Sequence, residues 1–315
     1  ATWRPAFLVN VPIGPLLIIL VPRLVPADEP RATRRLDFAG LAVATSAVFL
    51  FVLPLVLGRE LGWPVWCFLC MALGLLLAAA FVPLERQVAA RGGDPLLNFA
   101  VLRAPGIGSG ISTLTCMQIA YGGFLFVFTL HLEAGLGDGA LRAGLTYIPM
   151  SATFGLLGFY WRKLPARLHH VLGPVGLALC TVGYLGIAVA MRSGGQGAPL
   201  MWAALVVTGA GFGLSAAPVL TQALLRVPLA RAADASGVLT TTVQLNQVIG
   251  VALFGTLFLS VADGAAAGTR AQASAAALST TGVWLALLAL LGVAAGIALS
   301  RTVHNAHSQG EKGSS

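Results

Sequence analysis

Nine long apolar segments are the feature that most constrains how this chain can fold. Each runs for about 20 residues or more with hardly a charged side chain, and about 20 apolar residues in an α-helix cross the hydrocarbon core of a bilayer. The segments are 7–25, 38–57, 64–84, 106–130, 143–161, 171–191, 199–225, 235–262 and 280–300. We therefore expect an all-α fold, a polytopic transmembrane bundle of about nine membrane helices in contact with the lipid bilayer.

The composition excludes a protein that is mainly surrounded by water. Hydrophobic residues make up 57% of the chain and charged residues 10%, whereas about a quarter of the residues in soluble domains are charged. Membrane-spanning strands would alternate in polarity, and these segments are continuously apolar. Helices are therefore expected throughout, with little chain left for a soluble domain.

Basic residues alternate between the two sides of the predicted membrane. With nine helices threaded in order, one side holds Arg23, Arg31, Arg34, Arg35, Arg86, Arg91, Arg103, Arg162, Lys163, Arg167, Arg226, Arg231, Arg301 and Lys312, and the other holds Arg4, Arg59, Arg142, Arg192 and Arg270. Loops rich in Lys and Arg stay in the cytoplasm. This places the C-terminus in the cytoplasm and the N-terminus of the segment outside, in a plasma (inner) membrane, and it explains the positive charge without a nucleic-acid partner.

Two loops rich in Pro, Gly and charge divide the chain. The parts are a first helix in 1–25, a cytoplasmic connector in 26–104 with helices at 38–57 and 64–84, six helices in 105–301, and a polar tail in 302–315 that we expect to be disordered. The six helices have short connections and could form a complete bundle.

Several motifs resemble one family of transporters. Trp3, Arg4, Phe7, Asn10, Pro12, Ile13 and Gly14 resemble the W-R-x-x-F-x-x-N-x-P-I-G signature that opens the sixth helix of the 14-helix drug:proton antiporters of the major facilitator superfamily. Matching segments further along are Asp94 to Leu97, Ala143 to Leu145 with Pro149, and Ala235 to Gly237 with Gln244 and Gly250. The resemblance implies that 1–25 ends an N-terminal bundle, that 38–57 and 64–84 are linker helices, and that 105–301 is the C-terminal bundle.

The resemblance also implies a function. It implies proton-coupled efflux of lipophilic or cationic small molecules by alternating access, driven by the proton gradient without a cofactor, and it implies that this chain works with N-terminal helices that the sequence lacks. Two alternatives from other classes stay open, a membrane-embedded enzyme and a membrane partner subunit that does not transport. An enzyme needs a cluster of acid–base or metal-binding residues, and the sequence indicates no catalytic or metal site.

Uncharged polar side chains inside the apolar segments are the candidates for a substrate pathway. Such groups need a partner or water and therefore face the interior of a bundle. The candidates are Gln118, Tyr121, Gln244, Asn246 and Gln247, with Phe124, Phe128 and Tyr147 as aromatic surface for lipophilic substrates. Hydrogen bonding between helices, and ordinary packing for the aromatic residues, are the alternative interpretations of the same residues.

Two further patterns carry expectations. The loop 161–173 resembles a degenerate form of the family's gating motif, with Arg162 and Arg167 kept and Ala166 in the acidic position. Gly209, Gly211 and Gly213 lie within an apolar segment, where small residues let helix backbones approach closely. In the eighth segment, Asn246 and Gln247 stand where the family commonly has Gly-Gly, which argues against close packing at that point and adds polarity.

Overall fold

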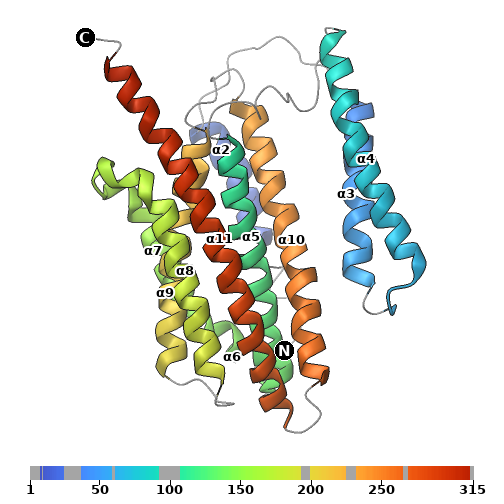
Figure 1. The fold of residues 1–315 in the computed structure, drawn as a ribbon, viewed down its shortest axis with the longest axis vertical. Coiled ribbons are helices and arrows are strands. Elements are labelled where there is room, and N and C mark those ends of the chain that lie inside the picture. The colour runs from blue at the N-terminus through green and yellow to red at the C-terminus, as the bar shows by residue number, and fades with distance from the viewer. Residues whose placement is uncertain are drawn as a thin grey trace. The chain divides into compact units, whose positions relative to one another are not determined.

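The structure is a computed structural model that describes residues 8, 10–24, 37–58, 61–91, 107–192, 199–224, 232–264 and 269–312. These residues form helices joined by turns, and no strand occurs among them. Figure 1 shows the helices along the chain from α2 to α11. The all-α fold of a polytopic membrane protein, predicted from the apolar segments, is confirmed.

The helix bounds follow. The α-helices are α2 (Asn10–Leu24), α3 (Phe38–Leu57), α4 (Val65–Ala90), α5 (Ile107–Leu130), α6 (Ala140–Thr146), α7 (Ile148–Tyr160), α8 (His169–Met191), α9 (Pro199–Leu224), α10 (Ala232–Gly264) and α11 (Arg270–Lys312). A π-helical turn, η2 (His131–Gly135), follows α5, and two 3-10 turns, η3 (Trp161–Lys163) and η4 (Ala166–Leu168), precede α8.

Six spans in the described part of the chain are long and apolar enough to cross a membrane. They are Val65–Val88, Gly108–Gly135, Ala166–Met191, Pro199–Leu224, Ala235–Gly264 and Arg270–Ala298, with shorter apolar helices at Val11–Leu24 and Ala39–Pro54. The predicted segment 143–161 differs, because the structure divides it into α6 and α7 at Tyr147. Pro149 lacks a backbone N–H, and this removes one bond of the helical ladder at the break.

The last helix is longer than the sequence predicts at both of its ends. The predicted segment is 280–300, and α11 begins at Arg270 and ends at Lys312. Residues 302–312 continue this helix, 313–315 lie outside the described residues, and the disorder expected of the tail in solution stays a prediction. Extending an existing helix needs no new nucleus, so a polar segment without proline can continue it.

The connector contains a helical hairpin made of α3 and α4, which pack against each other. The turn between them uses Gly62 with a φ of 71°, a left-handed conformation that glycine adopts without steric cost. Further along, Gly74 lies so close to α3 that a Cβ there would come within 2.8 Å of the Ala47 carbonyl oxygen. The two linker helices predicted in this region thus form one closely packed pair.

The glycines of α9 allow three helices to approach closely. A Cβ at Gly209 would lie 2.1 Å from the Met150 carbonyl oxygen of α7, and one at Gly211 would lie 2.5 Å from the Gly176 carbonyl oxygen of α8. A Cβ at Gly213 would lie 2.7 Å from the Phe154 carbonyl oxygen of α7. The prediction that these glycines permit close helix approach is confirmed, and they do so on two sides of α9.

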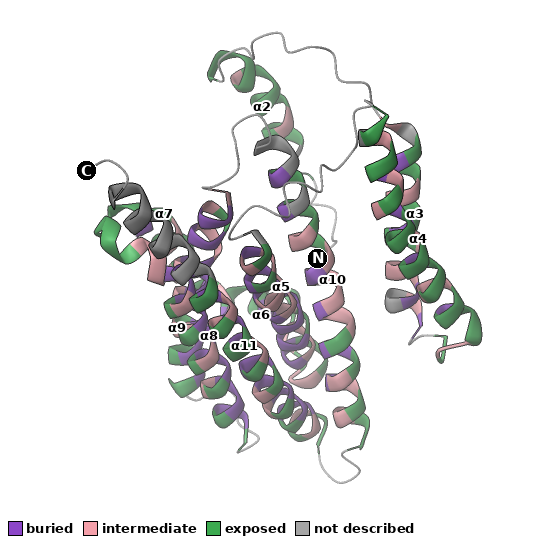
Figure 2. Cartoon of the chain, turned by 45° about the horizontal axis from the view of Figure 1, so that its top comes forward, coloured by how far each residue is buried: buried purple, intermediate pink, exposed green. Residues whose placement is uncertain are grey.

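Burial separates the interior of the bundle from its outer surface. Figure 2 shows buried residues where α5, α8, α9 and α11 meet and exposed residues on their outward faces. Most of the outward side chains are large and apolar, as contact with lipid requires. The helix α2 lies in a separate unit, residues 1–37, and its residues 11–24 are all exposed or half-buried.

Candidate functional site

The pairing of α5 with α10 brings most of the candidate polar residues into one region. Asn246 on α10 is buried and donates its side-chain amide to Thr115 Oγ1 on α5 over 3.0 Å. Both residues lie well inside their helices, away from the ends. The hydrogen bond satisfies a polar group that would otherwise be costly inside an apolar bundle.

Close packing of α5 and α10 uses one glycine from each helix. A Cβ at Gly122 would lie 2.5 Å from the Gln247 carbonyl oxygen, and one at Gly250 would lie 2.1 Å from the Ile119 carbonyl oxygen. The expectation that losing Gly-Gly at 246 and 247 argues against close packing is therefore wrong. Gly122 on the partner helix supplies the space that α10 lacks at this level.

The two candidates on α5 lie one turn apart and differ in exposure. The side chain of Gln118 is buried, and Tyr121 is half-buried against the core. Tyr121 packs edge-on against Phe212 of α9, with ring centroids 4.6 Å apart. On α10, by contrast, Gln244 is exposed and Gln247 is half-buried. The structure therefore gathers Asn246 and Gln247 at the α5 interface and leaves Gln244 on an open face.

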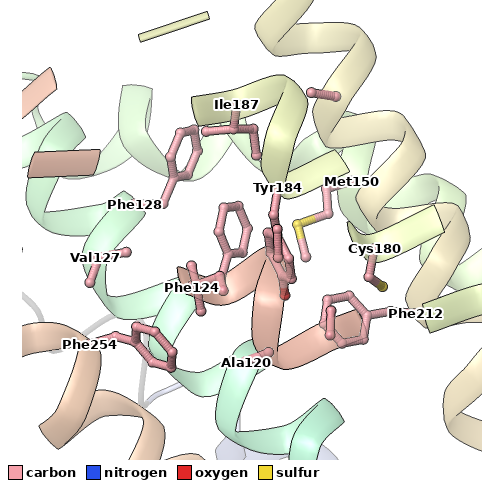
Figure 3. Close-up of a cluster of buried hydrophobic side chains, with 14 of the residues drawn as sticks. Ala120, Phe124, Val127, Phe128, Met150, Cys180, Tyr184, Ile187, Phe212 and Phe254 are labelled. Atoms are coloured by element: carbon pink, nitrogen blue, oxygen red, sulfur yellow. The ribbon is translucent and has the colours of Figure 1, made fainter. Parts of the chain in front are cut away.

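Aromatic side chains form a continuous series through the bundle. Tyr184 contacts Phe124 at a centroid distance of 5.3 Å, and Phe124 stacks on Phe128 at 5.3 Å. Figure 3 shows these rings grouped with Phe212 in the buried cluster. Phe124, Phe128 and Tyr184 are almost fully buried. Phe124, a candidate for contact with substrate, is a core residue in this conformation.

Tyr147 ends the aromatic series at the break between α6 and α7. Its ring meets Phe128 edge-on at 5.4 Å. Its hydroxyl donates to the Leu125 carbonyl oxygen over 2.9 Å and lies 2.9 Å from Thr129 Oγ1. A side chain at the helix break is thereby tied to α5, and the candidates Tyr121, Phe124 and Tyr147 all belong to one connected aromatic cluster.

The loop predicted to act in gating is ordered by aromatic and amide contacts. Trp161 is buried, its ring meets His169 at 5.1 Å, and the Arg162 guanidinium lies over it at 5.6 Å. Gln222 of α9 donates its amide to the His169 carbonyl oxygen over 2.5 Å. Arg167 is exposed in η4. Trp161 and Gln222 therefore attach this loop to the bundle.

Some residues of this region were not singled out by the sequence. Tyr184 and Phe212 complete the aromatic series, and Gln222 holds the loop before α8. A period of three to four residues links Tyr121, Phe124 and Phe128 on one face of α5, and this signal is present in the sequence. The partners on α8 and α9 depend on tertiary packing, which one sequence does not reveal.

These features define a multi-pass α-helical membrane protein whose bundle interior combines aromatic rings with a few polar side chains. No protein-family model matches the chain. Comparison with curated proteins finds the "Probable actinorhodin transporter" of Streptomyces coelicolor, 34% identical over 89% of this chain and 50% of that protein. The "Multidrug resistance protein Stp" of Mycobacterium tuberculosis is 28% identical over 81% of this chain and 47% of its own length.

A third relative is the "Multidrug efflux pump LfrA" of Mycolicibacterium smegmatis, 29% identical over 89% of this chain and 55% of that pump. The chain is thus related over most of its length to proteins named as transporters and drug-efflux pumps, in agreement with the resemblance of its motifs to the major facilitator antiporters. It spans about half the length of the curated relatives it matches.

Proposed function

We propose that this chain forms the C-terminal portion of a proton-coupled secondary transporter that exports lipophilic or cationic small molecules by alternating access. The observation that carries the proposal is the α5–α10 pair, where Gln118, Asn246 and Gln247 place polar groups inside an apolar bundle. Buried polar groups of this kind inside membrane helices mark pathways as well as helix contacts. The relatives named as efflux pumps and transporters support the same class of function.

The proposed pathway runs along one side of the α5–α10 pair. Gln244 is exposed on α10 and Tyr121 is half-buried on α5, so both are available to a substrate, whereas Phe124 and Tyr147 support the wall behind them. In this proposal the other wall comes from N-terminal helices that the sequence does not contain. Substrate sites of such transporters lie at the interface between two halves.

The proposed orientation follows the distribution of basic residues. The protein lies in the plasma (inner) membrane with the N-terminus of this segment outside and the C-terminus in the cytoplasm. The loop with Arg162 and Arg167 is then cytoplasmic, and both side chains are exposed there. We assign this loop a gating role, in which the aromatic and amide contacts of Trp161 and Gln222 hold the cytoplasmic ends of α7, α8 and α9 together.

Ethidium efflux from cells that express the complete gene tests the proposal. The expected result is lower ethidium retention than in cells with an empty vector, and loss of that difference when a protonophore removes the proton gradient. Equal retention with and without the gene would contradict transport and favour a membrane-embedded enzyme or a non-transporting subunit. Efflux that persists after the protonophore would contradict the proton coupling and leave the transport function supported.

Gln118→Leu keeps the size of the side chain and removes its polar group. If Gln118 contributes to the pathway, this variant reduces efflux while the protein remains in the membrane at its normal amount. Cys70→Ser, on the linker helix α4, is a matched control, because it also changes polarity within a membrane helix but lies outside the bundle.

A further inference from the structure

His131 is a buried ionisable side chain at the end of a membrane span. It opens the π-helical turn η2 directly after α5, and its side chain is 1% exposed. Its Nδ1 lies 2.5 Å from Ser274 Oγ on α11. Single π-helical turns are rare and are frequent at functional sites. An ionisable residue inside a membrane span also indicates a functional site.

A glycine next to the imidazole ring of His131 leaves space for its contact with Ser274. Gly135, one turn after His131, lies against Ser274, and a Cβ there would come within 1.9 Å of Ser274 Oγ and 3.4 Å of His131 Nδ1. Any side chain at 135 would displace the hydroxyl from the imidazole. The turn η2 packs on α5, α6 and α11, so His131 lies where three helices meet.

The other ring nitrogen has no partner. Within the described residues, His131 Nε2 is buried and forms no hydrogen bond. In the neutral tautomer that carries its hydrogen on Nδ1, this hydrogen is donated to Ser274 Oγ and Nε2 keeps a lone pair. This lone pair is the position at which the ring can accept a proton, and a negative charge close to it favours the protonated form.

Counter-charges are available at the same end of the bundle. Asp138 follows η2, its backbone N–H donates to the Leu132 carbonyl oxygen, and its side chain is 10% exposed. Its carboxylate is paired with the exposed Arg142 of α6 at 3.2 Å. Glu133 is exposed on η2, and Arg270 begins α11 one turn before Ser274. The helix α5 contributes no Asp, Glu, Lys, Arg or His.

A hollow next to these groups gives water a route to this end of the bundle. It has a volume of about 420 Å³ and is lined by Leu132, Asp138 and Arg142 together with Thr146 and Trp202. Leu132 directly follows His131, and Asp138 belongs to the loop that follows η2. Opening of the bundle at this end would therefore bring water to the imidazole.

We propose that His131 is a proton-binding site of the C-terminal bundle and that its protonation is coupled to the transport cycle. The inference rests on the proposed function and orientation, which place η2 at the external end. One proton from external water binds Nε2, the Nδ1–H bond to Ser274 is kept, and the ring gains one positive charge at the end of the bundle that carries Asp138 and Glu133. Loss of the same proton returns the neutral ring.

The test compares two modes of transport in proteoliposomes that contain the complete protein. Exchange of labelled for unlabelled substrate without a pH gradient needs the substrate site alone. Uptake driven by an imposed pH gradient needs a proton site as well. The variant His131→Asn keeps an amide near the position of Nδ1, so it can still bond Ser274, but it cannot bind a proton. His304→Asn makes the same chemical change beyond the predicted membrane segment 280–300 and is the matched control.

In the wild type, driven uptake changes with pH by up to about tenfold per pH unit across the titration of a single group. We expect His131→Asn to remove this dependence, while exchange stays within about twofold, as for a substitution that leaves the substrate site intact. An unchanged pH profile in His131→Asn would overturn the inference. Absence of exchange in the wild type would instead overturn the proposed function.

Ser274→Ala separates proton binding from a merely structural role. It removes the hydrogen bond and keeps the base, so we expect lower thermal stability with the pH dependence retained. If His131→Asn does not fold, deuterium exchange at the imidazole C2 position in the wild type reports the protonation of each histidine. Protonation of His131 that changes when substrate is added supports the inference, and a protonation that is the same with and without substrate overturns it.

Discussion

The side-chain amide of Asn246 on α10 donates to the hydroxyl of Thr115 on α5 over 3.0 Å. One turn away along α5, Gln118 is buried as well, and Gly122 lets the two backbones approach at the level of Gln247. Some polar side chains in this bundle therefore hold α5 and α10 together. The question for each of them is whether it holds the helices together or meets the substrate.

Comparison of Asn246→Ala with Gln244→Ala separates a side chain that holds the helices together from one that contacts the substrate. The first removes a buried hydrogen bond, and we expect it to destabilise the bundle by about 1 to 3 kcal/mol because Thr115 loses its partner. The second changes an exposed side chain, so the melting temperature in detergent should stay the same while substrate transport changes. Equal melting temperatures for both variants would contradict the distinction.

Gly209→Val tests the packing of α7 on α9. A Cβ at this position would meet the Met150 carbonyl oxygen at 2.1 Å, so the helices must separate. We expect a loss of about 1 to 3 kcal/mol, as for other overpacked sites, measured as a lower unfolding temperature. Gly155→Val on α7 is the control, because nothing lies within 4 Å of a Cβ there. Equal effects of the two substitutions would show that α7 and α9 are not this close.

The sequence predicts the helical class, because a run of about 20 apolar residues has one stable arrangement in a bilayer. It also predicts the function of the small residues in α9, since Gly209 and Gly213 lie four positions apart on one face. It does not predict the ends of α11 or the break at Tyr147. Those depend on how a polar tail continues a helix and on how a tyrosine hydroxyl is bound by a neighbouring helix.

The candidate site is predictable in part for the same reason. Polar residues such as Asn246 are visible against an apolar background, and the structure gives Asn246 a partner on α5. The sequence does not distinguish the exposed Gln244 from the buried Asn246, which are two positions apart. It also gives no sign that His131 meets Ser274, since 143 positions separate them and only the packing of α11 on η2 brings them together.

Tyr147→Phe tests the attachment of the helix break to α5. The substitution removes the hydroxyl that donates to the Leu125 carbonyl oxygen and keeps the ring that packs on Phe128. We expect a loss of about 1 kcal/mol in stability, the usual net value of one hydrogen bond. Hydrogen exchange should also be faster at the start of α7. Tyr160→Phe, where the ring is exposed, is the control, and the attachment is disproved if both variants behave alike.

Gln222→Leu tests the contact that holds the loop before α8. Without the amide, the His169 carbonyl oxygen loses its donor and the loop opens more often. A loss of about 1 kcal/mol raises the open population by about fivefold. Trypsin should therefore cut faster after Arg162, Lys163 or Arg167, which are all exposed. Gln244→Leu makes the same change outside this contact and should leave the cleavage rate as it is; a similar rate in both variants would argue against the role of Gln222.

Transport by reconstituted protein is the most direct test of the central claim, that this bundle is one half of a proton-driven efflux transporter. The complete protein and residues 1–315 alone are placed in separate proteoliposomes, a pH gradient is imposed, and accumulation of a lipophilic cation such as ethidium is followed. The account predicts concentrative accumulation by the complete protein, collapse of that accumulation when the gradient is removed, and none by residues 1–315. Accumulation by the isolated segment, or none by the complete protein, would contradict it.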